Sequence, residues 1–342
     1  MHYLITGGAG FIGSHLAERL LQLEHSVTVL DDLSTGCYQN IEHLQDAKGF
    51  RFIKDTVLNT DLVEWLIRDC AAIFHLASAV GVKLIMEQPV KTIESIFQGT
   101  DAVLSIASRY RRRFLLTSTS EVYGKSEDIP FREDGDRVAG PTHKHRWAYA
   151  EAKALDEFLA LAHYRETKLP VVVARLFNTV GPRQSGQYGM VLPNFVKAAL
   201  EERELVVHGD GSQKRCFCHV RDVVEALVGL MECSHSAGKV FNVGSEEEIS
   251  IRGLADLVIE RTKSNSAIRF VPYAQAFGDG FEDMKRRVPC TKRIQSLLGW
   301  KPRTSLMEIV DDVIDHAAGT SPAANGDCRA STGRAKSVLS AN

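Results

Sequence analysis

The sequence has no run of apolar residues that approaches the roughly 20 needed to cross a bilayer as a helix. Neither sign of charge dominates, because 41 Lys and Arg stand against 43 Asp and Glu. That balance gives no electrostatic reason to expect a nucleic acid or an anionic membrane as partner. The N-terminal segment has no basic region and no cleavage signature, so we expect no signal peptide. Together these absences favour a cytoplasmic protein.

The sequence also lacks a Cys-x-x-Cys pair. Its 7 cysteines are odd in number and scattered, which is typical of reduced thiols rather than of a disulfide framework. Cys216 and Cys218 lie two residues apart, so on a strand they would share a face and could bind a metal. No second ligand cluster follows His219. We therefore interpret both cysteines as reduced thiols and predict no metal site.

What the sequence does contain is an alternation of short apolar segments with segments of helical spacing. Residues 11–23 carry their large apolar side chains at the intervals of one helix face. The apolar segments that predict strands are residues 2–6, 26–30, 50–53, 72–76, 114–118 and 171–175. Such strands, alternating with helices, are typical of a parallel sheet covered on both faces. The sequence therefore predicts an α/β fold with a Rossmann-type doubly wound parallel sheet.

Three glycines near the N-terminus have the spacing of a dinucleotide-binding loop. Gly7, Gly10 and Gly13 follow the first apolar strand and begin the first helix, which is the context that makes this motif specific. Gly7 allows the tight turn, Gly10 lets the backbone approach a pyrophosphate, and Gly13 lets helix and strand pack closely. The amides at the helix N-terminus, where Phe11 and Ile12 stand, then face the phosphates.

Residues at the strand ends indicate which dinucleotide is bound. Asp31 ends the second strand about 20 residues after the glycines, where a carboxylate accepts hydrogen bonds from ribose hydroxyls and repels a 2′-phosphate. We therefore predict NAD as the cofactor. Asp32 serves either the ribose or the turn, and Asp55 serves either the adenine edge or a helix cap. Leu76 and Ala77, after the fourth strand, are further candidate cofactor contacts.

The pattern divides the chain into two parts and a tail. We expect residues 1–180 to form the NAD-binding Rossmann domain, with some later segments returning to it. Residues 181–318 predict mainly a smaller mixed α/β substrate-binding lobe over the carboxyl edge of the sheet, where open α/β sheets bind ligands. Residues 319–342 are rich in small residues and poor in large apolar ones, which predicts a disordered tail.

A second motif carries the chemistry. Tyr149 and Lys153 stand four residues apart, so on a helix they share a face. A phenol is a poor base because its pKa is about 10, and we expect the lysine charge to lower that pKa. Thr119, at the end of the fifth strand, is placed to hydrogen-bond a substrate oxygen. With the dinucleotide loop upstream, the three residues predict oxidation of a substrate hydroxyl.

Several blocks of the sequence resemble the extended short-chain dehydrogenase/reductases that modify nucleotide sugars. The matching blocks are residues 6–13, 118–124, 149–153, 175–183, 209–215 and 298–302. The resemblance implies a UDP-sugar substrate, held in the lobe with its C4 against the nicotinamide.

The resemblance also implies which residues bind that substrate. Asn178 is expected to touch the sugar or its phosphates. Arg215 and Arg287 are expected to clamp the diphosphate, because a guanidinium fork matches phosphate oxygens. The further candidate contacts are Lys83 in the loop after the fourth strand, Arg183, and Asn194 and Val207 near the base.

The same resemblance implies a reaction that begins at C4. Tyr149 takes the hydroxyl proton while NAD takes the hydride, which gives a 4-keto sugar. Glu121 then favours loss of CO2 from a uronic acid, because residues 118–124 resemble UDP-glucuronate decarboxylases, in which this glutamate assists decarboxylation. Residues 214–217 resemble decarboxylases as well. Ser120 stands where dehydratases usually carry Asp, which argues against dehydration.

A UDP-sugar 4-epimerase is the alternative. Residues 79–83 lack the proline of the decarboxylases and look more like an epimerase loop, and Glu121 can also be an inert carboxylate at a strand end. A non-catalytic dinucleotide-binding protein is a distant alternative, disfavoured because Tyr149 and Lys153 are both present. A reductase that uses NADPH is disfavoured by Asp31.

Two positions depart from the family pattern. Ile96 stands where an Asn often helps to hold cofactor and water. Cys290 stands where an Asp is usual, which we interpret as a helix N-cap. Residues 143–146 are a basic cluster before Tyr149, near the expected substrate mouth. The cluster could attract an anionic sugar, but we favour the interpretation as a solvated loop. The resemblance finally implies a homodimer, formed by residues 90–110 and the helix of Tyr149 as a four-helix bundle.

Overall fold

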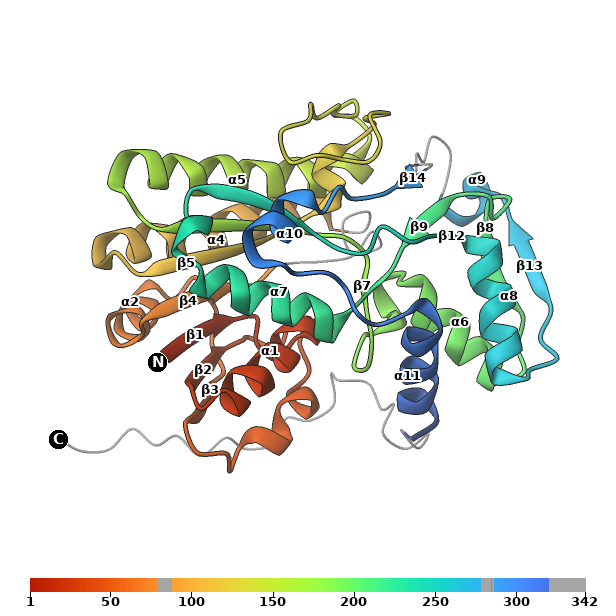
Figure 1. Cartoon of the computed structure of the whole chain (residues 1–342), viewed down its shortest axis with the longest axis horizontal. Coiled ribbons are helices and arrows are strands. Elements are labelled where there is room, and N and C mark those ends of the chain that lie inside the picture. The colour runs from red at the N-terminus through yellow and green to blue at the C-terminus, as the bar shows by residue number, and fades with distance from the viewer. Residues whose placement is uncertain (79–87, 278–283, 285, 320–342) are drawn as a thin grey trace.

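A parallel sheet of seven strands forms the centre of the molecule (Figure 1). The computed structural model describes residues 1–78, 88–277, 284 and 286–319. The strand order is β11-β6-β5-β4-β1-β2-β3. Those strands are β1 (His2–Thr6), β2 (Ser26–Leu30), β3 (Phe50–Ile53), β4 (Ala72–His75), β5 (Arg113–Thr119), β6 (Val171–Leu176) and β11 (Lys239–Val243). The chain reverses its direction of winding between β1 and β4, and open α/β sheets bind ligands at the carboxyl ends of the strands at such a point. The predicted Rossmann-type sheet is confirmed.

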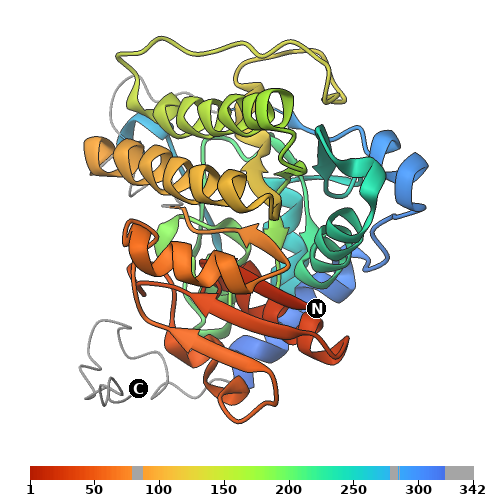
Figure 2. The same cartoon turned by 90° about the vertical axis from the view of Figure 1, so that its left-hand side faces the viewer.

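Both faces of the sheet are covered by helices because both faces of each strand are apolar. In β1, Tyr3 and Ile5 pack in one hydrophobic cluster, whereas Leu4 between them packs in the cluster on the opposite face. This alternation follows from the two-residue period of a strand. The helices are α1 (Phe11–Gln22), α7 (Val220–Glu232) and α10 (Lys292–Leu298) on one face, and α2 (Thr60–Asp69), α4 (Pro89–Tyr110) and α5 (Ala148–Thr167) on the other (Figures 1 and 2).

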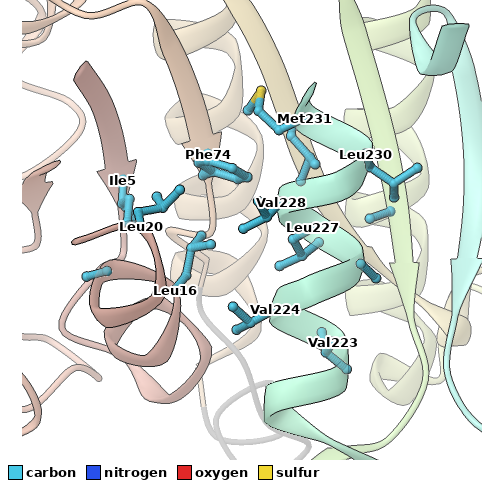
Figure 3. Packing of buried hydrophobic residues seen from close by; sticks show 14 of the residues in the cluster. Ile5, Leu16, Leu20, Phe74, Val223, Val224, Leu227, Val228, Leu230 and Met231 are labelled. Carbon is cyan, nitrogen blue, oxygen red and sulfur yellow. The ribbon is translucent and has the colours of Figure 1, made fainter. Parts of the chain in front are cut away.

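The face covered by α1 and α7 shows how the second half of the chain returns to the sheet. Figure 3 shows Leu16 and Leu20 of α1 facing Val224, Leu227 and Val228 of α7, with side chains of the sheet beside them. Strand β11 continues this return, because it pairs in parallel with β6 from Lys239 to Val243. The sheet and the helix layer on this face therefore contain segments from before and after residue 181.

The remaining segments form a smaller lobe with its own core. Strand pairs β8·β13 and β9·β14 are parallel, and β9·β12 is antiparallel. The strands are β8 (Leu205–His208), β9 (Lys214–Cys216), β12 (Glu248–Ser250), β13 (Ile268–Val271) and β14 (Arg286–Arg287), and the main helices are α6 (Val191–Leu200), α8 (Ile251–Thr262) and α11 (Leu306–Gly319). Two short strands, β7 (Thr179–Val180) and β10 (Cys218–His219), pair where the chain passes from the sheet to the lobe.

Some expectations fall outside the described residues. They are Lys83, the loop 79–83 and the tail from residue 320 to residue 342. Among the helices that the structure does describe, none combines the length and the apolar composition needed to cross a membrane.

Candidate active site

Gly7 and Gly13 of the glycine-rich loop lie too close to neighbouring backbone atoms to carry a side chain. Gly7 has φ +73°, and a Cβ there would lie 2.6 Å from the backbone nitrogen of Ala77. A Cβ on Gly13 would lie 2.4 Å from the carbonyl oxygen of Gly7. Gly10 caps α1 with no side-chain hydrogen bond, so the first-turn amides at Phe11 and Ile12 receive no side-chain cap. A loop and helix N-terminus of this shape fit the diphosphate of a dinucleotide.

The exit of β4 lies against the same loop. The backbone N–H of Leu76 donates to the Thr6 carbonyl over 3.0 Å, and the N–H of Ala77 reaches the Thr6 hydroxyl over 3.5 Å. Leu76 and Ala77, the two candidate cofactor contacts, therefore lie at the carboxyl end of β4 beside Gly7. Their position is compatible with the predicted role, which stays a prediction.

Asp31 braces the loop from the end of β2. One carboxylate oxygen accepts the Ala9 N–H over 2.9 Å, and the other accepts the Leu33 N–H over 2.8 Å. Burial raises the pKa of Asp31 despite these amide hydrogen bonds. Each oxygen keeps a lone pair for a ribose hydroxyl, so the residue can brace the loop and bind the cofactor together.

Asp32 and Asp55 make local hydrogen bonds, but Asp55 is not itself a helix cap, because the N-cap of α2 is Asn59. The Ser34 N–H donates to Asp32, and the Thr56 N–H donates to Asp55. The second oxygen of Asp55 accepts the side-chain amide of Asn59, which caps α2. Neither contact tests the proposed binding of ribose or adenine.

Tyr149 lies in the first turn of α5, directly after the short 3₁₀ helix η4 (His145–Trp147). Its hydroxyl shares a hydrogen bond with Thr119, at the end of β5. The Thr119 hydroxyl also accepts the N–H of Glu121 over 3.2 Å, which caps the 3₁₀ helix η3 (Ser120–Tyr123). The structure thus brings together three predicted catalytic residues from two segments of the chain.

The expected effect of Lys153 on Tyr149 needs correction. Burial, followed by the negative charges of Glu121 and Asp156, raises the pKa of Tyr149, although the Thr119 hydrogen bond and Arg287 oppose that shift. The Lys153 ammonium is itself ion-paired, because its Nζ lies 2.9 Å from Oδ2 of Asp156. The shared helix face was predicted correctly. A lowered phenol pKa was not, because the spacing of Tyr149 and Lys153 does not reveal the buried acid beside the lysine.

Glu121 is surrounded by guanidinium groups. Its side chain is 12 % exposed and is ion-paired with Arg146 and, over 3.4 Å, with Nη2 of Arg287. Burial alone raises the pKa of Glu121, but the charges of Arg146, Arg287 and Arg215 and the Arg146 hydrogen bond lower it to about 2. Glu121 is therefore an anion at neutral pH, and three buried arginines surround its one negative charge.

Arg146 is a residue whose role was missed from the sequence. The segment 143–146 was interpreted as a solvated loop, but the Arg146 side chain is only 4 % exposed and packs over the ring of Trp147. The interpretation was wrong at this position because η4 turns the arginine inward toward Glu121. The signal was present in the neighbouring Trp147, whose bulk favours burial.

The candidate substrate residues occupy different settings. Arg215 and Arg287 are each 8 % exposed and adjacent on the paired strands β9 and β14. Asn178 donates its side-chain amide to the Cys216 carbonyl over 2.8 Å, which ties the exit of β6 to β9. Arg183 contacts Glu18 over 2.6 Å and Ser14 over 3.3 Å, so it holds the lobe to α1.

The two residues predicted near the base differ in exposure. Asn194 is exposed and donates its amide to the Gly186 carbonyl over 3.1 Å. Val207 is fully buried in the lobe core, so its side chain contributes packing there. Their contact with a base stays a prediction.

The departures from the family pattern are also located. Ile96 is buried in α4 with 1 % of its surface exposed. Cys290 precedes Thr291, which is the N-cap of α10 and donates its N–H and its hydroxyl to Glu246. Cys290 is thus outside the capping position. Cys216 and Cys218 are buried thiols without a disulfide, and no group of three or more metal-binding side chains occurs among the described residues.

The sequence matches the model of a known protein family and is similar to those of known proteins. The family model described as GDP-mannose 4,6 dehydratase matches residues 4–313. The chain is 41 % identical over 303 residues to a UDP-N-acetyl-α-D-glucosaminuronate decarboxylase of Bacillus cytotoxicus, covering 88 % of this chain and 93 % of the relative. It is 39 % identical over 313 residues to UDP-glucuronic acid decarboxylase 1 of Danio rerio, covering 92 % and 72 %.

A solved structure is similar over nearly the whole fold. It is a UDP-glucuronic acid 4-epimerase from Bacillus cereus in complex with UDP-glucuronic acid and NAD. Its TM-score is 0.84 at 26 % identity, with 93 % of this chain and 99 % of that chain covered. The similar proteins therefore include both decarboxylases and an epimerase.

Proposed function

The chain belongs to the family of NAD-dependent nucleotide-sugar epimerases and dehydratases, and we propose that it is a decarboxylase of a UDP-linked uronic acid. The similarity to two decarboxylases over about nine-tenths of the chain supports this reaction over epimerisation. NAD is the proposed cofactor, because the glycine loop fits a diphosphate and Asp31 stands where a ribose is bound. We propose that the sheet domain holds NAD and the lobe holds the UDP-sugar.

The observation that carries the proposal is the setting of Glu121. Arg146 and Arg287 contact this carboxylate, and Arg215 lies close enough to affect its pKa. Three positive charges around one negative charge leave an excess of positive charge in a partly desolvated site. That excess suits a substrate that carries a carboxylate as well as a diphosphate. A neutral hexose adds no such charge.

In the proposed reaction Tyr149 and Thr119 act on the C4 hydroxyl of the sugar. Thr119 hydrogen-bonds the oxygen and orients it, and Tyr149 accepts its proton. When bound, NAD would supply the hydride acceptor for C4, and its oxidised nicotinamide would carry a positive charge beside Tyr149 before the hydride is transferred. Since the phenol pKa is raised in the protein alone, Tyr149 needs added positive charge to act as a base.

Loss of CO2 follows from the ketone that this oxidation makes. The carboxylate at C5 is then β to a carbonyl, so the C5–carboxylate bond breaks and its electron pair moves onto the ketone oxygen. A proton from the medium adds at C5, CO2 leaves, and Tyr149 returns its proton to the C4 oxygen. In this proposal the arginines beside Glu121 hold the substrate carboxylate near the Glu121 carboxylate. Glu121 cannot accept a proton at neutral pH, because its pKa is about 2.

The test compares three substrates with the purified protein. UDP-glucuronate, UDP-N-acetylglucosaminuronate and UDP-glucose are each incubated with NAD-loaded protein, and the products are followed by NMR and mass spectrometry. Loss of the mass of CO2 from either uronate is expected. Isomerisation without a mass change would instead assign a 4-epimerase. A Tyr149→Phe variant is expected to lose about 10²- to 10⁴-fold in turnover, and full turnover by that variant would remove the proposed base.

We also propose a homodimer formed by α4 and α5. These helices pack against each other (Figure 2), and Val90, Ile93, Leu155 and Phe158 on them are exposed. Val90 and Phe158 are 67 % and 65 % exposed, which is unusual for side chains of this size on neighbouring helices. Two such helix pairs can close into a four-helix bundle that buries these residues.

A further inference from the structure

A chain of buried hydrogen bonds leads from the glycine-rich loop to Lys153. The hydroxyl of Thr6, directly before Gly7, lies 2.8 Å from Nδ1 of His75, and Nε2 of His75 lies 3.3 Å from the hydroxyl of Thr100. The Thr100 hydroxyl donates to Oδ2 of Asp156 over 2.9 Å. Lys153 donates to that same oxygen over 2.9 Å. The chain crosses β1, β4, α4 and α5 and ends on a single carboxylate.

The direction of these bonds makes Asp156 the final acceptor, because both Thr100 and Lys153 donate to it. Burial, followed by the charge of Lys153, lowers the pKa of His75 to about 3, so the ring is neutral and donates through one nitrogen only. Because Thr100 donates to Asp156, the ring donates to Thr100 and accepts from Thr6. The donors therefore follow one another toward Asp156. Burial raises the pKa of Asp156, and the charge and hydrogen bond of Lys153 and the hydrogen bond of Thr100 oppose that shift.

The carboxylate is completely enclosed. Asp156 is 0 % exposed, and Lys153 is 3 % exposed at the side chain. The second oxygen of Asp156 is also buried and has no hydrogen-bond partner among the described residues. A buried charge that is not fully hydrogen-bonded acts strongly on its neighbours, because little water screens it. One such neighbour is Tyr149, seven residues earlier on the same helix.

We propose that Asp156 is a positioning residue for the oxidation step, which anchors the Lys153 ammonium and limits how much positive charge reaches Tyr149. This inference rests on the proposed function for its role in turnover. Lys153 is held against α4 by Asp156 and Thr100. At the phenol the charge of Asp156 opposes that of Lys153, and Asp156 is among the groups that hold the phenol in its neutral form.

Other charged groups also face this part of the site. Around Asp156 these groups are Lys153 and Glu157, both on α5. Neutral His75 on β4 reaches Asp156 only through Thr100 on α4. Around Tyr149 the charged groups are Glu121 on η3 and Arg287 on β14. Glu157 is ion-paired with Arg175 over 2.7 Å, and Glu121 is paired with two arginines. Asp156 is thus the acid whose removal changes the charge beside Lys153 and leaves the arginine pairs intact.

The experiment titrates Tyr149 in NAD-loaded protein. The ultraviolet absorbance of tyrosinate is measured against pH in Asp156→Asn and in the wild type, each with and without Tyr149→Phe to isolate the one phenol. Removing the charge of Asp156 should raise the tyrosinate fraction of Tyr149 about three- to tenfold at a fixed alkaline pH. In turnover, the pH profile of C4 oxidation should move to lower pH. Asp156→Glu, which keeps the charge, should restore the wild-type profile.

Controls separate this effect from simple damage to the fold. Glu151→Gln makes the same change of charge on the exposed part of the same helix, and it should leave the titration unchanged. If Asp156→Asn does not fold, Asp156→Ser removes the charge with a smaller side chain that still hydrogen-bonds Lys153. An unchanged or a higher pKa of Tyr149 in a folded variant overturns the proposal. The absorbance titration needs no sugar substrate, so it decides this point even if no uronate is decarboxylated.

Discussion

Nη2 of Arg287 lies 3.4 Å from Oε1 of Glu121, although the two residues are separated by 166 positions in the chain. The contact joins β14 of the lobe to η3 at the end of the fifth strand of the sheet. Arg146 contacts the other oxygen of the same carboxylate. The acidic residue that distinguishes the proposed reaction is therefore held from the lobe and from the segment before Tyr149.

The first prediction concerns Glu121, whose removal should separate oxidation of C4 from the loss of CO2. A Glu121→Gln variant keeps Tyr149 and Thr119, so it should still oxidise C4 of the uronate. The loss of CO2 should slow by about 10²-fold or more. The reason is that Arg146 and Arg287 then lack their anionic partner, which displaces the carboxylate of the substrate. Rapid-mixing absorbance should show reduced nicotinamide that persists, together with a 4-keto uronate by NMR. Glu127→Gln, an exposed change nearby, is the control, and an unimpaired release of CO2 by Glu121→Gln would contradict the assigned role.

The second prediction concerns pH and the buried His75. Its pKa is about 3 in the folded protein and 6.5 when unperturbed, so only the unfolded chain binds a proton between these values. The stability from neutral His75 is therefore complete above about pH 6.5 and is lost as the pH falls toward 3, by about 1.4 kcal/mol per pH unit. Urea unfolding of the wild type and of His75→Gln at several pH values should show a steeper loss in the wild type by this amount.

The absolute stability of His75→Gln does not matter for that comparison, since only the slope with pH is used. His145→Gln, which changes an exposed histidine, should keep the wild-type slope. Equal slopes for wild type and His75→Gln would show that His75 titrates normally in the folded state.

The third prediction concerns the close packing at Gly13. A methyl group there would lie 2.4 Å from the Gly7 carbonyl and 2.6 Å from the Cα of Gly8, both of which are backbone atoms. Gly13→Ala should therefore move the loop, abolish NAD binding measured by calorimetry and reduce stability by about 1–3 kcal/mol. Gly229→Ala in α7 is the matched control, because its Cβ meets only the end of the Leu298 side chain at 3.1 Å. Retained NAD affinity in Gly13→Ala would exclude this loop as the diphosphate site.

The fourth prediction concerns the proposed dimer. Phe158→Glu places a charge on the exposed apolar surface of α4 and α5, and it should convert the dimer to a monomer because burial of an unpaired carboxylate is costly. Light scattering over a range of protein concentrations measures this change. Phe270→Glu alters a half-exposed aromatic residue on β13 of the lobe and should leave the mass unchanged. A wild-type monomer, or a dimer that survives Phe158→Glu, would reject the interface.

The sheet and its cofactor loop could be predicted because their signals are local. Apolar runs of four or five residues predicted β1, β2, β3, β4, β5 and β6, and helical spacing predicted α1. The glycine spacing of the loop reflects close backbone packing that any side chain would disturb. The positions of Tyr149 and Lys153 on one helix face follow from the same short-range periodicity.

The electrostatic setting of the site could not be predicted in the same way. Arg146 looked like one member of a basic loop, yet its guanidinium is buried against Glu121, 25 residues earlier. Asp156 carried no recognised motif, although its place three residues after Lys153 put it within reach on the helix. What made the pair matter was Thr100 on another helix, together with the exclusion of water from both side chains.

The order of amino acids thus specified the α/β class, the dinucleotide loop, the tyrosine–lysine pair and the family, since each depends on spacings of a few residues. The folded chain specified the charge state of that pair and the arrangement of the three arginines around Glu121. A pKa depends on desolvation and on every charge within a few ångströms. Those neighbours come from strands and helices up to 166 residues away, and their distances exist only after the chain has folded.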